Sequence, residues 1–380
     1  MAHNPGSTRI RLVAHWIRAN LFRDLPNTLV SVAAIAGILW VLARLLNWAV
    51  WQASWVETCR AIVPRPPGPE ASGACWTVLV DNAGILAFGF YPPELWWRPI
   101  LALLLLPVAL APICVRSLPR GWLVVPGFYP VIAYALIWGA FGLAPVSSER
   151  IGGFLLTLII AIPGAPLALL LGIAFALIRR NAILPIRALI AAILGVFRAI
   201  PLIVFVVTGF LLKGLPLPFW IFIDPITFFT LLISLATGAR IAEALQPQLV
   251  AIPSGQREAA RSLGFSGRGA FWIVILPQAM HGASPQIVLI LAGLLRDTTF
   301  VMFVGLLDPL QLASVIRVYP DWNSAFFEVL FAVGLIYGLM SFAMARYACH
   351  LQRRDAARNP HPVNLTQVPR QHPAPFATPS

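Results

Sequence analysis

Residues Ile252–Ala279 read IPSGQREAARSLGFSGRGAFWIVILPQA and separate two long apolar stretches of the chain. Ser254 is placed to cap a short helix, and Gly264 suits the left-handed residue that ends such a helix. Ser266 can cap a second helix, which Pro277 is expected to end before the next apolar stretch begins. The segment therefore predicts two short helices joined by a tight turn at a membrane surface.

Small and apolar residues of the first of these helices, Ala259, Ala260 and Leu263, fall at helical spacing on one face. An ordinary cytoplasmic loop would also be basic, because loops on that side of a membrane usually are. A solvated loop, however, needs neither paired caps nor a small-residue face. We therefore expect the loop, placed at residues 243–277, to dock on a partner.

The composition excludes several classes of protein. The chain has 380 residues, of which 59% are hydrophobic and 11% charged, as in a polytopic membrane protein. The formal net charge of +13 comes from arginines spread over many loop ends, which argues against nucleic-acid binding. The single lysine, Lys213, follows Leu212, so the chain has no Gly-Lys-Ser/Thr phosphate loop and ATP chemistry must come from another polypeptide. No His, Cys or carboxylate spacing indicates an enzyme, a metal site or a cofactor.

Eight apolar runs are long enough to be considered as membrane spans, since a span takes about 20 residues. They lie near residues 28–48, 98–115, 121–142, 152–178, 188–212, 219–239, 284–307 and 325–347. With both termini in the cytoplasm, most arginines fall in cytoplasmic segments, as the positive-inside rule requires. We predict an all-α integral membrane protein organised as a cytoplasmic tail (1–26), a membrane extension (27–150) with an outer loop (52–97), a membrane domain (151–348) and a disordered tail (349–380).

The outer loop contains two cysteines, Cys59 and Cys75. In this topology both face an oxidising compartment, where a disulfide between them is plausible. Two unpaired thiols remain the alternative.

Polar residues interrupt two of the predicted spans. A charge in hydrocarbon costs on the order of 2.5 to 3.5 kcal/mol, so such groups usually face a protein interior or a transport route. We expect Arg198 and Asp297 to form an ion pair, and we leave open whether the group is structural or lines a route for a zwitterionic solute. The residues assigned to this group are Arg198, Pro201, Arg296, Asp297, Thr298 and Thr299.

The basic loop is similar to a known family signature. Glu258–Ala260 (EAA), then Gly264 and Leu276–Pro277, resemble the EAA signature of ABC-importer membrane subunits. The similarity extends from about residue 151 to residue 348, and within that group it resembles the polar amino acid permeases, especially those of general L-amino-acid importers. Arg240 stands where an aromatic residue is usual in that family.

This resemblance implies a type I ABC importer permease fold and uptake of polar L-amino acids across the bacterial inner membrane. It implies as partners a second, homologous permease subunit, two ATPase subunits and a periplasmic amino-acid-binding protein. An ion-coupled secondary transporter and a non-transporting assembly subunit are the alternatives. The residues that the resemblance assigns to ATPase coupling are Glu243, Glu258, Ala259, Ala260 and Gly264.

Overall fold

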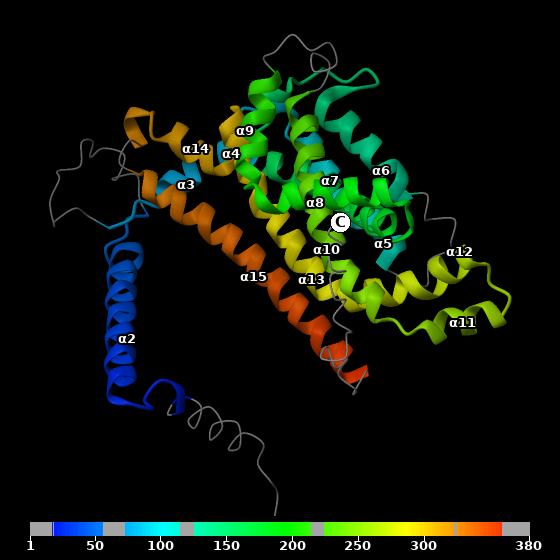
Figure 1. Ribbon diagram of the computed structural model, residues 1–380. Helices are drawn as coiled ribbons and strands as arrows, with labels where there is room; N and C mark the ends of the chain where they lie inside the picture. The colour runs from blue at the N-terminus through cyan, green and yellow to red at the C-terminus, as the bar shows by residue number, and fades with distance from the viewer. Residues whose placement is uncertain are drawn as a thin grey trace, which may run out of the picture. The chain divides into compact units, whose positions relative to one another are not determined.

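The computed structural model describes residue 17 and residues 19–55, 73–114, 125–213, 224–322 and 325–358. The described residues form helices and two isolated bridges but no sheet. The chain divides into two compact units, residues 1–82 with 316–329, and residues 83–315 with 330–380. Figure 1 shows the helices of both.

The first unit contains a long apolar helix and a small folded segment. Its described elements are α2 (Leu25–Leu46), the π-helical turn η1 (Asn47–Trp51), α3 (Thr77–Asp81) and the short turn η9 (Pro320–Trp322). The indole N–H of Trp76 donates to the carbonyl of Ala49 at 2.8 Å, and the buried carboxylate of Glu328 accepts the N–H of Cys75 at 3.1 Å. Part of the predicted outer loop is therefore held by polar contacts to residues outside the loop.

The disulfide prediction concerns this folded segment. Cys75 is disulfide-bonded. Cys59 lies outside the described residues, so the pairing of Cys59 with Cys75 stays a prediction.

The second unit holds most of the membrane helices. In chain order its elements are α4 (Ala83–Phe88), η3 (Pro93–Leu95), α5 (Trp97–Cys114), α6 (Val125–Tyr134), η5 (Ala135–Gly139), η6 (Ser148–Arg150), α7 (Gly153–Asn181), α8 (Leu184–Ala199), α9 (Leu202–Lys213), α10 (Pro225–Ala251), α11 (Ser254–Ser262), α12 (Gly267–Ala270), η7 (Phe271–Ile275), α13 (Leu276–Asp297), η8 (Thr298–Val304), α14 (Pro309–Ile316) and, from Leu330 onward, α15 (Phe326–Arg358).

The helix pair α7 and α10 forms the centre of this unit. Gly172 of α7 and Gly238 of α10 lie where the helices cross, and a Cβ at Gly172 would come within 2.6 Å of the Ile241 side chain. Small residues at such a crossing let two backbones approach closely, which is how membrane helices gain packing energy. Ile241, which contacts this crossing, is fully buried.

The number of spans differs from the expected eight. Among the described residues, six helices are long and apolar enough to cross a membrane, or seven if one bent pair counts as a span. That pair is α8 and α9, which meet at 101° where Pro201 interrupts the apolar run. In the described part of the predicted span at residues 121–142, the apolar helix Phe128–Gly139 is shorter than a full span. The prediction of an all-helical membrane protein is confirmed, whereas the count of eight is not.

The C-terminal boundary also differs from the prediction. Helix α15 continues to Arg358, so residues 349–358 of the tail predicted to be disordered are helical. The remainder of that tail lies outside the described residues.

Candidate functional site

The basic loop folds as two short helices joined by a tight turn, as predicted. Gly264 has a left-handed backbone with φ of 83°. The N–H of Gly264 donates to the carbonyl of Arg261 at 2.9 Å, and the N–H of Phe265 donates to the carbonyl of Ala260 at 3.2 Å. These two bonds form a Schellman motif, in which glycine is favoured because other residues pay for the left-handed backbone. The predicted end of the first helix is confirmed.

The two predicted caps behave differently. Ser266 caps α12, because its Oγ accepts the N–H of Gly269 at 3.1 Å. Ser254 does not cap α11. It is the first residue of the helix, and the preceding Pro253 holds the cap position without a side-chain hydrogen bond.

The segment after Ser266 does not end at Pro277. Residues from Gly267 to Val304 form one continuous apolar helical stretch. Pro277 lies in the first turn of α13, directly after the π-helical turn η7. The predicted helix stop at this residue is therefore wrong.

The start of the loop also differs from the prediction. Helix α10 continues to Ala251, so residues 243–251 are helical and the turn region begins at Ile252. Glu243 consequently lies within α10. We call α11, α12 and the turn between them the coupling hairpin (residues 254–270), and Figure 1 shows it extending away from α10 and α13.

The residues of the predicted small-residue face do not share one environment. Ala260 is buried next to the turn of the coupling hairpin, whereas Glu258 and Ala259 are exposed. Leu263 is exposed over 79% of its surface. Ala260 is therefore closed to a partner, and the other three residues are available to one.

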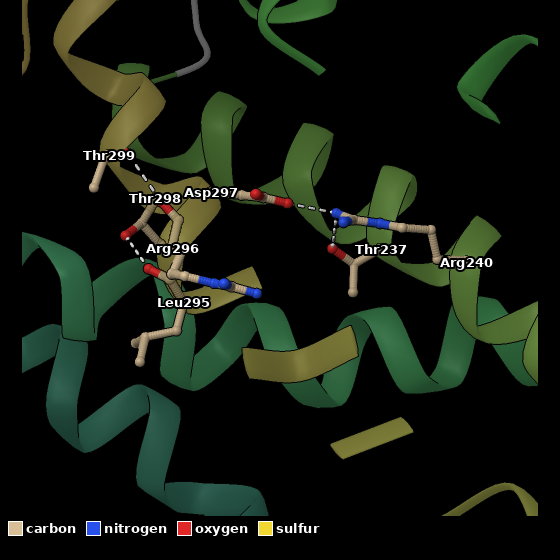
Figure 2. Close-up of polar contacts among 7 residues, drawn as sticks. All are labelled: Thr237, Arg240, Leu295, Arg296, Asp297, Thr298 and Thr299. Carbon is tan, nitrogen blue, oxygen red and sulfur yellow. Dashed lines mark hydrogen bonds and ion pairs between the residues drawn. The ribbon is translucent and has the colours of Figure 1, made fainter. Parts of the chain in front are cut away.

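A short charged contact joins α10 to α13. Nη2 of Arg240 lies 2.6 Å from Oδ2 of Asp297, and the same nitrogen donates to Oγ1 of Thr237 at 3.3 Å. Figure 2 shows Asp297 and Arg240 pointing toward one another across the two helices. The expected pair of Arg198 with Asp297 is therefore wrong, because Arg240 lies one helical turn after Thr237 on α10 and reaches the carboxylate first.

Arg198 has a different partner. Its Nη1 lies 3.7 Å from Oε1 of Glu243, with the Arg198 side chain 75% exposed and that of Glu243 34% exposed. Helix α10 thus carries an arginine and a glutamate three residues apart, and each pairs with a neighbouring helix. Sequence reasoning missed the role of Arg240, because the predicted span ends at residue 239. The departure of Arg240 from the family's usual aromatic residue was the available signal.

The other residues of the predicted polar group lie beside this pair. The hydroxyls of Thr298 and Thr299 donate to the carbonyls of Leu295 and Arg296, each at 2.8 Å, so both threonines close the end of α13 (Figure 2). The Arg296 side chain is exposed and forms no ion pair with any residue that the structure describes. Pro201 begins the bend between α8 and α9.

Comparison with known proteins supports the resemblance. Residues 165–354 match the family described as "Binding-protein-dependent transport system inner membrane component". The glutamate/glutamine/aspartate/asparagine transport system permease protein BztC of Rhodobacter capsulatus is 32% identical over 89% of this chain and 93% of its own length. The inner membrane amino-acid ABC transporter permease protein YhdY of Escherichia coli K12 is 34% identical over 94% of this chain and 97% of its own length.

Among solved structures, one described as an amino acid ABC transporter with histidines covers 52% of this chain and 90% of its own chain, at 25% identity and a TM-score of 0.44. The family match and the two long relatives cover the region of the coupling hairpin and of the Arg240–Asp297 pair. This chain belongs to the family of binding-protein-dependent transport system inner membrane components.

Proposed function

We propose that this chain is the membrane-spanning subunit of an ATP-driven importer of polar L-amino acids. The names of its relatives support the substrate class, since one is a glutamate/glutamine/aspartate/asparagine permease and the other an amino-acid ABC transporter permease. Membership of the family favours this function over an ion-coupled secondary transporter and over a non-transporting assembly subunit. The chain itself is a permease, and ATP hydrolysis belongs to a partner.

The family indicates an inner membrane location, an ATPase and a binding protein as partners. We further propose that a homologous permease subunit completes the importer, with two ATPase subunits and a periplasmic binding protein. Both termini would lie in the cytoplasm, because this orientation places most arginines on that side. The coupling hairpin would then face the ATPase.

The observation that carries the coupling role is the geometry of the hairpin. Its turn is fixed by the Schellman motif at Gly264, Ala260 beside that turn is buried, and Glu258 and Ala259 remain exposed. A surface element that is rigid and attached at both ends to long membrane helices can transmit a displacement, which a flexible loop would absorb. Glu243 would act differently from the exposed residues, by tying α10 to α8 through Arg198.

The proposed route for the solute runs beside the end of α13. The carboxylates of Asp297 and Glu243 are already paired with arginines. Arg296, exposed and without an ion pair among the described residues, is the arginine available to a solute carboxylate. Thr298, Thr299 and the bend at Pro201 belong to the same proposed route, in which closure of the ATPases would change access from the inner to the outer face.

Substitution of Gly264 tests the coupling role. A Cβ at Gly264 meets nothing within 4 Å, so a side chain there disturbs the backbone and not the packing. A left-handed backbone costs a non-glycine residue about 1 to 2 kcal/mol, and β-branched residues are the least suited to it. We expect Gly264→Val to insert normally but to lose co-purification with the ATPase and ATP-driven uptake in proteoliposomes.

Gly264→Asn is the matched control, because asparagine tolerates the left-handed region. It should retain most of the uptake. If Gly264→Val takes up as much solute as Gly264→Asn, this turn has no role in coupling.

A further inference from the structure

The carboxyl group of Asp308, which is not part of the proposed route, lies buried at the start of α14. Asp308 is 1% exposed and precedes Pro309, the first residue of that helix. Its Oδ1 accepts the N–H of Gln311 at 2.8 Å and so caps α14. Its Oδ2 is buried and has no hydrogen-bond partner. One oxygen of the carboxylate therefore caps α14, and the other has no hydrogen-bond partner.

The surroundings of Asp308 are polar but carry no compensating charge. The hydroxyls of Thr157 on α7 and Tyr337 on α15 lie 2.8 Å apart and are hydrogen-bonded to each other. Tyr337 also lies near the hydroxyl of Thr298 and within electrostatic reach of the Asp308 carboxyl. No arginine in the described part of the chain forms an ion pair with Asp308, unlike Asp297.

An uncompensated buried carboxylate is unfavourable. Burial raises the pKa of the Asp308 carboxyl to about 6, against the opposing effect of backbone N–H groups that include that of Gln311. The group is therefore mostly ionised at neutral pH, in a place where a lone charge is costly. A cation that donates hydrogen bonds to Oδ2 would relieve this cost.

We propose that Oδ2 of Asp308 binds the ammonium group of the transported amino acid, with the hydroxyls of Tyr337 and Thr298 as further acceptors. This inference rests on the proposed function and names the part of the solute that this site recognises. A primary ammonium has three N–H donors, and a carboxylate oxygen with two hydroxyls supplies three acceptors. The site is closed in this structure, so the solute reaches it when α14 and η8 separate from α7 and α15.

The position of the site agrees with the direction of import. In the proposed orientation, α13 runs outward from the coupling hairpin, and Asp308 follows the end of its apolar stretch at Val304. A solute released at the outer face would therefore meet Asp308 early. Asp308 also lies on the same continuous segment as Thr298 and Thr299.

Asp308→Asn is the discriminating variant. Asparagine caps helices about as well as aspartate, so Gln311 keeps its acceptor, while the anion is replaced by a neutral amide. Asp224→Asn is the matched control. Asp224 caps α10, and its Oδ2 already accepts the N–H groups of Ile226 at 3.0 Å and Thr227 at 3.1 Å.

The experiment uses the complete importer in nanodiscs and in proteoliposomes, with radiolabelled L-glutamine as the probe. Without the binding protein, Asp308→Asn should weaken equilibrium binding of L-glutamine to the permease complex at least tenfold. With the binding protein and ATP, it should lower uptake at least tenfold. Asp224→Asn should change neither by more than about twofold. The melting temperature of the Asp308→Asn complex should be equal to or higher than that of the wild type, because the variant removes an uncompensated buried charge.

Three outcomes would overturn the inference. Unchanged binding and uptake in Asp308→Asn would reduce Asp308 to a helix cap. A lower melting temperature would show that the carboxylate already has a compensating partner. Binding that requires Na⁺ in the wild type, and loses this requirement in Asp308→Asn, would assign the site to a metal ion. A wild type that binds L-glutamine but shows no ATP-driven uptake would refute the proposed function alone, since the binding assay needs neither ATP nor the binding protein.

Discussion

Neutralising Arg240 or Asp297 should reveal a strong energetic coupling between α10 and α13. We consider Arg240→Gln, Asp297→Asn and the double variant in a double-mutant cycle. Nη2 and Oδ2 lie 2.6 Å apart, and the side chains are 41% and 21% exposed. Exposed pairs typically contribute about 0.2 to 1 kcal/mol, whereas removing one partner of a fully buried pair costs about 3 to 5 kcal/mol. The coupling energy of this half-buried, charge-assisted contact should lie between these two ranges, at about 1 to 2 kcal/mol.

The assay is unfolding of the purified protein by SDS in mixed micelles, followed by tryptophan fluorescence, for the wild type and the three variants. The pair formed by Arg198 and Glu243 provides an internal control on the same helix. Its atoms are 3.7 Å apart and Arg198 is 75% exposed, so its coupling energy should be below about 0.5 kcal/mol and should vanish at high salt. A coupling energy for Arg240 with Asp297 that is no larger than this control would refute the reasoning.

Three further predictions concern other parts of the chain. The pKa of Asp308, about 6 when folded, lies above its ordinary value of 3.8, so the unfolded state releases the proton first as the pH rises. The free energy of unfolding should therefore fall by at most about 3 kcal/mol as the pH rises from about 4 to about 6. Asp308→Asn should abolish that part of the pH dependence of the melting temperature. Gly172→Leu should destabilise the protein by at least about 2 kcal/mol in SDS unfolding, because a Cβ there would already lie 2.6 Å from Ile241; a smaller loss would mean that α7 and α10 separate easily. A thiol reagent should label Cys59 and Cys75 only after reduction, and labelling of the untreated protein would exclude the bridge between them.

The coupling hairpin was the most predictable part of the structure because its signals are local. The roles of Gly264 and Ser266 depend on residues within four positions of each, so the sequence alone contains both partners of every hydrogen bond. Ser254 and Pro277 were misread for a different reason. Helix α11 begins at Ser254 itself, and the π-helical turn η7 leads directly into α13, so a proline that usually ends a helix occupies the first turn of one.

The ion pairs could not be predicted in the same way. The sequence shows which charges lie within apolar runs, but the choice of partner depends on how α8, α10 and α13 cross. Arg240 was assigned to a loop because the end of α10 was placed near residue 239, whereas the helix continues to Ala251. Because Arg240 lies inside α10, it forms the ion pair with Asp297 that was expected of Arg198. The wrong helix boundary therefore produced the wrong ion pair.

These contacts place α10 between the coupling hairpin and the proposed route. The hairpin joins the end of α10 at one side and leads into α13 at the other. Arg240 ties α10 to α13, and Glu243, three residues later, ties α10 to α8. A displacement of the hairpin must therefore either move α10 and α13 together or break the shorter of the two pairs. The coupling energy of Arg240 with Asp297 distinguishes these outcomes, because a pair worth about 1 to 2 kcal/mol favours joint motion, whereas a pair worth close to zero would let α10 and α13 separate.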